Sequence, residues 1–471
     1  MNIFKNYIYQ FIYQLINIVF PLLTLPYISK VLGAENLGIY TYSFSIITYL
    51  VLVSDLGIRN YGSRKIAYCR ENEYELKKFF WELFLQKFYI SILIFLLSFI
   101  YFFYTNKNKI FLIQIFYIII SFLDISWLYQ GLEDFKKIML RNLILKLFLL
   151  VLIFLCIKEK DDLLKYTKLM IIVNLLGNLI LWAKLPIFNI KLKIKKLKPF
   201  SHLKNSFIMF FPQVAITMYT TLDRIMLGSM CDKKYVTYYD ISNKIIIVSM
   251  VLITTAGSVF LPKISNLYSN NRYEEIRELI KKSLNIFILI MFPLIFGILS
   301  VADGFIKLLF DKTYMEVAFL MKVMSITIIF WTLNNITGSH ILIPMGRENK
   351  ITFSVFLGCF INVGLNYILI KKYNALGAVI ATIITEGIVT IIQIYFSKDY
   401  FRVSLKTILK SLVSALIMFF ILKFISSLYL KIFLGGISYI LLILFLKEEN
   451  TLEIWNLFIL KIKETNYEKS R

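Results

Sequence analysis

The hydrophobic positions of this chain form long uninterrupted runs that recur from one end of the sequence to the other. Each run has about 20 residues, the length that an α-helix needs to cross the hydrocarbon core of a bilayer. Membrane β-strands would give shorter segments with alternating hydrophobicity. The pattern therefore predicts an all-α polytopic membrane protein with about 14 transmembrane helices. The expected spans are 8–31, 37–57, 84–104, 110–130, 138–157, 164–184, 205–229, 236–260, 283–302, 316–337, 351–370, 376–396, 405–424 and 429–446.

The chain also shows a weak internal repeat on either side of a basic loop, "NIKLKIKKLKPF" at 189–200. Six spans precede this loop, and afterwards the segment 224–246 can be laid beside 29–47, with Leu227-Gly228 on Leu32-Gly33. Two six-helix lobes of the same orientation, related by a pseudo-two-fold axis, would place a substrate site between them near the bilayer midplane. The predicted domains are an N-lobe (1–184), a basic cytoplasmic linker (185–204), a C-lobe (205–396), two extra helices (397–448) and a cytoplasmic tail (449–471) that includes an interfacial helix.

Composition and charge agree with a membrane location. The chain of 471 residues is 58% hydrophobic and only 17% charged, whereas soluble domains are about 45–50% apolar and about 25% charged. Placing both termini in the cytoplasm puts most of the Lys and Arg in cytoplasmic loops, as the positive-inside rule requires. The net charge of +24 is then a matter of topology. Since it is spread over short loops with no basic domain, a nucleic-acid partner is not expected.

The residues that carry most enzyme and metal chemistry are scarce. The four cysteines (Cys69, Cys156, Cys231 and Cys359) show no paired spacing, and only two histidines are present, His202 and His340. A metal site or a Cys/His nucleophile therefore has little raw material, and no phosphate-binding glycine loop is found. We expect neither an enzyme nor a cofactor, apart from a coupling ion, H⁺ or Na⁺.

Charged residues stand inside the apolar stretch "VAITMYTTLDRIMLGSM" at 214–230, where Asp223 follows Tyr219 at helical spacing and Arg224 comes next. A charge at mid-bilayer costs at least about 2.5–3.5 kcal/mol, so such residues usually face a cavity or a partner. The guanidinium of Arg224 suits phosphate oxygens, and Asp223 would hold it or take part in switching. The next span adds Asn243 and the pair Asp240 and Lys244, four residues apart, which could also be a purely structural ion pair.

Further polar side chains lie along other spans. The first span carries Gln10, Tyr13, Gln14, Asn17, Pro21 and Thr24 on one face, and Pro21 and Pro26 favour a bend. Other candidates are Tyr40, Lys87, Asp124, Lys146, Lys322, Asn334, Asn335 and Glu386. The two Asn residues could equally join helices, and Lys87 and Lys146 could extend to the headgroups. Asp55 and Arg59, four residues apart at a span end, are interpreted as a structural or gating pair, with Pro21 and Pro26 as gating positions.

Several stretches, in order, resemble one family. The segment 21–67 is similar to the opening of Wzx-type O-antigen and polysaccharide flippases, which belong to the MOP superfamily with MATE efflux pumps and MurJ lipid II flippases. The matching elements are Pro26, Leu32-Gly33, Gly38-Ile39-Tyr40, Leu56-Gly57 and Asn60-Tyr61-Gly62. "LDRIMLG" (222–228), "LPKISNL" (261–267) and "YNALGAVIATIITEG" (373–387) agree as well.

The resemblance implies a flippase that moves undecaprenyl-diphosphate-linked oligosaccharide from the inner to the outer leaflet of the bacterial cytoplasmic (inner) membrane by alternating access. It also implies a role in O-antigen, capsule or other surface polysaccharide synthesis, with membrane lipids and possible partners in a polymerase and a chain-length regulator. Because MurJ-like proteins carry an Arg in the first span and this chain has a neutral stripe there, lipid II is not the expected cargo.

Two other classes stay open at this stage. A MATE-like cation-coupled efflux antiporter would need an acidic, aromatic pocket, and the first span contains no acid. A membrane-bound polymerase or glycosyltransferase would need a large outer loop or a catalytic acidic pair, and the expected outer loops are short. The flippase is therefore the favoured interpretation.

Overall fold

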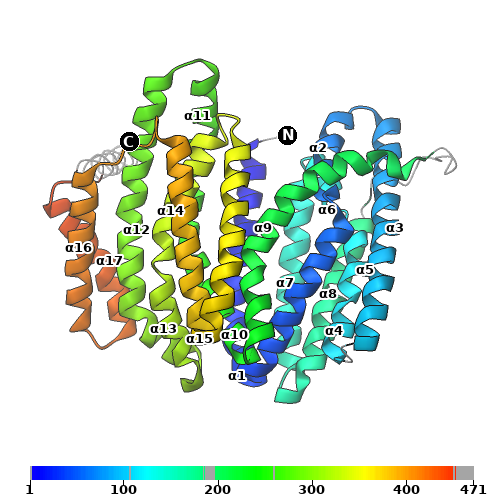
Figure 1. The fold of residues 1–471 in the computed structure, drawn as a ribbon, viewed down its shortest axis with the longest axis horizontal. Helices are drawn as coiled ribbons and strands as arrows, with labels where there is room; N and C mark the ends of the chain where they lie inside the picture. Colours follow the sequence, from blue (N-terminus) through cyan, green and yellow to red (C-terminus); the bar gives the residue numbers. More distant parts are fainter. Residues whose placement is uncertain are drawn as a thin grey trace, which may run out of the picture. The chain divides into compact units, whose positions relative to one another are not determined.

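The computed structural model describes the backbone of residues 3–105, 108–183, 185, 197–257, 260–448 and 451. Side chains are described for the same residues except 3–19, 252 and 254–257. The chain divides into two compact units, residues 1–240 and residues 241–471, and α10 contributes residues to both. Within the described residues all regular structure is helical (Figure 1). The lobes expected at 1–184 and 205–396, and the pseudo-two-fold axis between them, stay a prediction.

The first unit contains the helices up to the start of α10. Their bounds are α1 (Ile3–Asp55), α2 (Ile58–Cys69), α3 (Glu73–Thr105), α4 (Lys109–Gln114), α5 (Phe116–Leu123), α6 (Ser126–Gly131), α7 (Phe135–Cys156), η1 (Lys160–Asp162), α8 (Leu163–Ala183), η3 (Pro199–His202), α9 (Leu203–Met230) and α10 (Lys233–Gly257).

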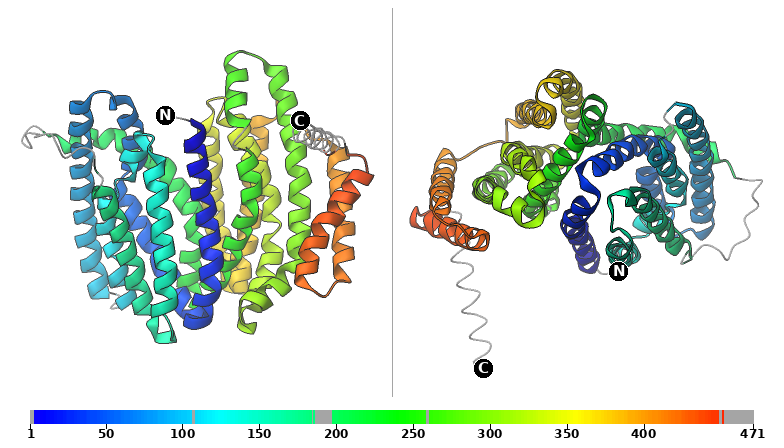
Figure 2. Two further views of the ribbon diagram at one scale, coloured as in Figure 1. Left: turned by 180° about the vertical axis from the view of Figure 1, so that it is seen from behind. Right: turned by 90° about the horizontal axis from the view of Figure 1, so that it is seen from below.

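The second unit begins within α10 and continues to the end of the chain. It contains α11 (Phe260–Ser269), α12 (Tyr273–Leu309), η4 (Lys312–Tyr314), α13 (Met315–Met324), α14 (Thr327–Asn335), the π-helical segment η5 (Ile336–Leu342), α15 (Glu348–Ser397), α16 (Leu405–Lys423) and α17 (Leu428–Phe445). The last two helices, in orange and red, pack against α12 (Figure 2). The predicted interfacial helix in the tail lies outside the described residues.

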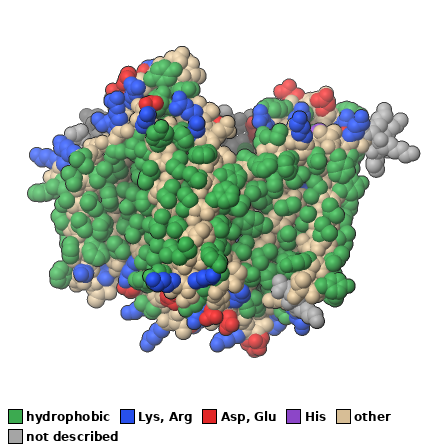
Figure 3. All heavy atoms as spheres, viewed as in Figure 1, with side chains coloured by type: hydrophobic (Ala, Val, Ile, Leu, Met, Phe, Trp, Pro, Cys, Tyr) green, Lys and Arg blue, Asp and Glu red, His purple; other side chains and the backbone are tan. Residues whose placement is uncertain are grey.

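The protein is a multi-pass membrane protein, as predicted. Within the described residues, nine helices are long and apolar enough to cross a bilayer, and a bent pair, Lys312–Met324 with Thr327–Leu342, would make ten. Hydrophobic side chains cover the middle of the visible helices, and charged side chains gather near the helix ends (Figure 3). The fourteen predicted spans are compatible with the helices, because α1 and α15 each contain two of them, and α9 and α10, which are not among these ten, cover the predicted spans 205–229 and 236–260.

The long helices α1 and α15 are each interrupted by one residue with non-helical backbone angles. In α1 this residue is Gly33, with φ 79° and ψ 165°, a region of conformational space that glycine alone enters readily. In α15 it is Asn374, with φ 50° and ψ −127°. The chain changes direction at both points, so each helix supplies two spans (Figure 2). By contrast, α1 keeps helical angles through Pro21 and Pro26.

The predicted span 110–130 is divided into three short helices, α4, α5 and α6. The break between α5 and α6 is at Asp124, whose backbone is extended and whose Oδ1 accepts a hydrogen bond from the backbone N–H of Ser126 at 2.9 Å. The indole of Trp182 donates to the carbonyl of Leu123 at 2.8 Å. These two bonds satisfy backbone groups that the break leaves without helical partners. The break thereby places the Asp124 carboxylate inside the first unit.

Replacing Gly57 by alanine is expected to destabilise the first unit by about 2 kcal/mol or more. Gly57 begins α2 with φ +75°, and a Cβ there would lie 2.3 Å from the carbonyl oxygen of Ser206 and 2.7 Å from the backbone nitrogen of Phe210. Both are backbone atoms of α9, so neither can move aside cheaply. Equilibrium unfolding in mixed micelles measures the loss.

The matched control is Gly364→Ala in the helical part of α15. A Cβ at Gly364 meets nothing within 4 Å, so alanine there should be neutral or stabilise by at most about 1 kcal/mol. Equal effects of the two substitutions would contradict the close approach of α2 to α9 at Gly57.

Candidate functional site

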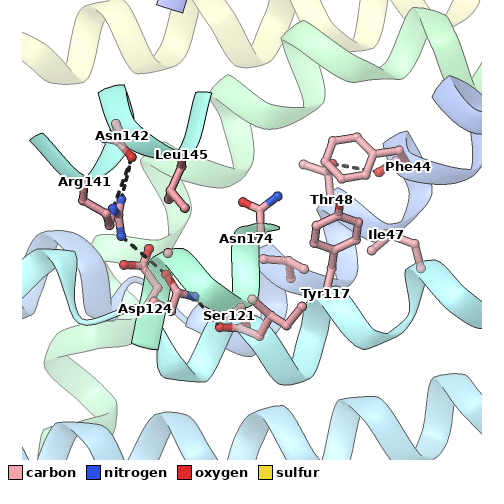
Figure 4. Close-up of a pocket in the computed structure, with 14 residues that line it drawn as sticks. Phe44, Ile47, Thr48, Tyr117, Ser121, Asp124, Arg141, Asn142, Leu145 and Asn174 are labelled. Carbon is pink, nitrogen blue, oxygen red and sulfur yellow. Dashed lines mark hydrogen bonds between the residues drawn. The ribbon is translucent and has the colours of Figure 1, made fainter. Parts of the chain in front are cut away.

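The first unit encloses a pocket of about 280 Å³ between α1, α5, α7 and α8 (Figure 4). Its lining combines aromatic and aliphatic residues with residues that carry hydroxyl, amide or charged groups. They are Phe44, Ile47, Thr48, Val51, Tyr117, Ile120, Ser121, Asp124, Arg141, Asn142, Leu145, Asn174, Gly177 and Asn178. Figure 4 shows Arg141, Asn142 and Asp124 at one end, Phe44 and Tyr117 at the other, and Asn174 between them.

The polar end of the pocket is organised around Arg141. Its Nη2 donates to Oδ1 of Asn142 at 2.9 Å, and its Nη1 donates to Oδ1 of Asn178 at 3.4 Å. Asn178 in turn donates from Nδ2 to the carbonyl of Ile120 at 2.9 Å. Side chains thus tie together three helices, α7, α8 and α5.

The aromatic end is built by α1 and α5. The rings of Phe44 and Tyr117 meet edge to face with centroids 5.2 Å apart. Tyr40 stacks on Phe44 with ring centroids 5.9 Å apart and packs edge to face on Tyr166 at 5.0 Å. The predicted site residue Tyr40 is therefore not part of the pocket lining but packs against Phe44, which is.

A buried ion pair lies next to the pocket. The Nζ of Lys87 is 2.7 Å from Oδ1 of Asp55 and donates to the carbonyl of Asp124 at 3.4 Å. Lys87 is only 4% exposed. Its amine therefore pairs with a carboxylate inside the bundle and does not extend to the headgroups.

Asp55 does not use the side chain of Arg59 as its ion-pair partner, although the two residues are four apart. Its Oδ1 pairs with Lys87, and its Oδ2 accepts a hydrogen bond from the backbone N–H of Arg59 at 3.2 Å. The carboxylate thus caps the start of α2 and neutralises an amine of α3. A gating role for Asp55, Arg59, Pro21 and Pro26 stays a prediction.

The neighbours Asp223 and Arg224 have different partners, both from the start of α10. The Nε of Arg224 is 2.8 Å from Oδ1 of Asp240, and the hydroxyl of Tyr239 donates to Oδ2 of Asp223 at 2.5 Å. Adjacent residues on a helix point about 100° apart, so one side chain does not have to neutralise the next. Arg224 is therefore paired not with Asp223, as one interpretation expected, but with Asp240. Residues of α10 supply a carboxylate to Arg224 and a hydroxyl to Asp223, and these contacts are called the crossed contacts below.

The remaining predicted residues of the first unit are placed as follows. The Nζ of Lys146 lies 5.4 Å from the centre of the Phe20 ring, a cation–π distance. Tyr219 is half-buried on α9. The side chains of Tyr13, Gln14 and Asn17 lie outside the described residues. Thr24 bonds only its own helix, to the carbonyl of Phe20 at 3.0 Å among the contacts described.

In the second unit, the predicted residues Asn334 and Glu386 are in contact. The carboxylate of Glu386 is 2% exposed and accepts hydrogen bonds from Nδ2 of Asn334, at 3.0 Å, and from the indole N–H of Trp331. Asn335 follows Asn334 in the sequence as the last residue of α14. Farther along α10, Asn243 is buried and Lys244 is half-buried. Whether these side chains touch substrate stays a prediction.

Several pocket residues were missed from the sequence, namely Arg141, Asn142, Asn174, Asn178 and Tyr117. Arg141 stands near the start of its predicted span, where a cation normally reaches the headgroups. Asn174 and Asn178 did carry a signal, because two amides four residues apart share one face of a helix. Among the described residues, no group of three or more His, Cys, Asp or Glu side chains is arranged to hold a metal ion.

Two family models match the chain. The model "Polysaccharide biosynthesis protein" matches residues 3–268, and the model "Lipid II flippase MurJ" matches residues 169–446. A protein of Escherichia coli strain K12 named "Putative O-antigen transporter" is 23% identical over 85% of this chain and 97% of its own length. The Staphylococcus aureus "Capsular polysaccharide biosynthesis protein CapF" is 23% identical over 84% of this chain and 100% of its own length.

Solved structures show the same fold. The lipid II flippase MurJ in an inward closed conformation superposes with a TM-score of 0.75 at 17% identity, covering 97% of this chain and 100% of that one. An inward-facing MATE family transporter of the MOP superfamily superposes with a TM-score of 0.64 at 12% identity, covering 87% and 96%. The fold is thus common to flippases and efflux transporters and does not by itself distinguish them.

Proposed function

The chain belongs to the polysaccharide biosynthesis protein family, and from this premise we propose that it is a flippase for undecaprenyl-diphosphate-linked oligosaccharide. It moves the lipid-linked repeat unit from the inner to the outer leaflet of the bacterial cytoplasmic membrane, for O-antigen, capsule or other surface polysaccharides. Family membership carries this proposal over the MATE-like alternative, since the fold is shared. The names of the Escherichia coli and Staphylococcus aureus relatives point the same way.

The physical barrier to this reaction explains why such a protein is needed. Each polar group taken into hydrocarbon without a hydrogen-bond partner costs roughly 2–7 kcal/mol, so a glycan with many hydroxyls cannot cross unaided. The chain has buried polar groups within helices that could cross a membrane, including Lys87 and Glu386, and Asp240 is buried in the 25-residue helix α10. Such groups offer partners that the bilayer lacks.

We further propose alternating access by two lobes, with Arg224 as the group that meets the diphosphate. Its guanidinium is 17% exposed and supplies a planar set of donors. Coupling to H⁺ or Na⁺ through Asp223, Asp240 or Glu386 is part of the same proposal. So are cytoplasmic termini and cooperation with a polymerase and a chain-length regulator.

Flipping in proteoliposomes tests the function directly. Purified protein is reconstituted with a fluorescent undecaprenyl-diphosphate oligosaccharide, and an impermeant quencher is added outside. We expect the inner-leaflet pool to become quenchable only in vesicles that contain protein, with or without an imposed H⁺ or Na⁺ gradient. If several glycans and both gradients leave the pool protected while a fluorescent organic cation is transported, the chain is an antiporter instead.

A further inference from the structure

We propose that the pocket between α1, α5, α7 and α8 binds one neutral sugar ring of the lipid-linked glycan. The inference rests on the proposed function for the choice of ligand, and on the chemistry of the pocket for everything else. The pocket is separate from Arg224, the residue assigned above to the diphosphate.

The hydrogen-bonding groups of the pocket are mixed. Arg141 supplies donors, Asp124 supplies acceptors, and Asn142, Asn174 and Asn178 supply both. Each hydroxyl of a sugar is also both a donor and an acceptor, so it can match such a set in several orientations. At neutral pH a phosphate or a carboxylate can accept hydrogen bonds but not donate them. The carboxylate of Asp124 and the amide oxygens would therefore repel it.

The charges at this site balance. Arg141 lies in the pocket with Asp124, and the adjacent pair of Lys87 and Asp55 adds one charge of each sign, 2.7 Å apart. A diphosphate needs a surplus of positive charge to replace its hydration. These four groups have none, so an uncharged ligand fits them better than an anion.

The shape and the apolar lining also favour a ring. The pocket holds about 280 Å³, just below the usual range of about 300–1,000 Å³ for small-molecule sites, so one ring fits and a whole oligosaccharide does not. Phe44 and Tyr117 form its far wall (Figure 4), where the C–H face of a sugar can lie. Phe44 is 37% exposed and Asn174 is exposed as well, so a ligand can reach both walls.

Saturation-transfer NMR on the full-length protein in detergent tests the inference without lipid or phosphate. The probes are glucose and N-acetylglucosamine, with glucuronate and inorganic diphosphate as charged comparisons. We expect saturation of a neutral sugar by the wild type. Asn174→Leu removes a donor and an acceptor at similar volume and should weaken the affinity about tenfold. Thr48→Val, which removes one hydroxyl at constant shape, should weaken it less.

The matched control is Asn266→Leu on α11, an exposed amide that does not line the pocket; it should bind sugar like the wild type. The pocket assignment is overturned, and the proposed function left intact, if the wild type flips lipid-linked glycan but shows no saturation transfer to either neutral sugar. Equal saturation in Asn174→Leu, Thr48→Val and wild type would overturn it too, since the sugar would then bind elsewhere. Displacement of the sugar by diphosphate or glucuronate would make the pocket an anion site. Sugar saturation that depends on Asn174, in a protein without flipping, would support the pocket and reject the flippase.

Discussion

Lys87→Met is expected to lower the free energy of unfolding by about 3–5 kcal/mol, the usual cost of removing one partner of a buried ion pair. Methionine has nearly the length of lysine, so the change leaves little empty space. It does leave the Asp55 carboxylate without the amine that lies 2.7 Å away, at a position where the Asp55 side chain is only 14% exposed. Equilibrium unfolding in mixed micelles, followed by the fluorescence of Trp127 and Trp182, measures the effect.

Two further variants separate charge from packing. The double variant Asp55→Asn with Lys87→Met buries no charge and keeps an acceptor for the Arg59 backbone N–H, so most of the loss should be recovered. Lys137→Met is the matched control, because Lys137 pairs with Asp134 at 2.9 Å with side-chain exposures of 36% and 29%. An exposed pair contributes about 0–1 kcal/mol. If Lys87→Met costs no more than Lys137→Met, the Asp55–Lys87 pair does not stabilise the bundle.

The helices were predictable because their signal is local. A run of about 20 apolar residues has few alternatives to a membrane helix, and the pattern around 8–57 and 351–396 marks two spans each. The sequence did not show that the chain turns at Gly33 and Asn374, because the backbone angles at these residues are set by the folded structure. The division of 110–130 at Asp124 was hidden because the acid stands in an otherwise apolar run. Of the two bonds that satisfy the break, the one to the Leu123 carbonyl comes from Trp182 on another helix.

The site was predictable only as far as charge inside an apolar run reveals it. Asp240, Arg224 and Glu386 were singled out in this way and Asn334 as an amide, but none of the four lines the pocket, and their role in a site stays a prediction. Spacing along one helix suggested Asp55 with Arg59, whereas packing gives Asp55 to Lys87, and Arg224 reaches Asp240 on the next helix. The pairing of Asp240 with Lys244 stays a prediction. Such partners lie on different helices, and a single sequence does not show which faces of two helices pack together.

Replacing both Arg224 and Asp240 by neutral amides should slow flipping about tenfold to a hundredfold while leaving the protein folded. Arg224→Ala alone cannot test the role of Arg224, because it also breaks the ion pair with the carboxylate of Asp240, which lies 2.8 Å from Nε and is 5% exposed. Breaking a buried ion pair can cost about 3–5 kcal/mol, so lost activity would be indistinguishable from unfolding. Arg224→Gln with Asp240→Asn keeps hydrogen-bonding groups on both helices and removes both charges.

The control for this double variant is Arg70→Gln with Glu133→Gln, which neutralises another Arg–carboxylate pair, 2.9 Å apart, whose side chains are 44% and 51% exposed. It should flip lipid-linked glycan at the wild-type rate.

A guanidinium carries five N–H donors, and the contact of Arg224 with Asp240 is through Nε, so the Nη groups are the ones that could meet the diphosphate oxygens. A charge-assisted hydrogen bond contributes about 1.5–3 kcal/mol, which sets the expected loss. Wild-type flipping by a folded Arg224→Gln, Asp240→Asn protein would mean that the diphosphate binds elsewhere, and that the crossed contacts between α9 and α10 serve only to hold the two helices together.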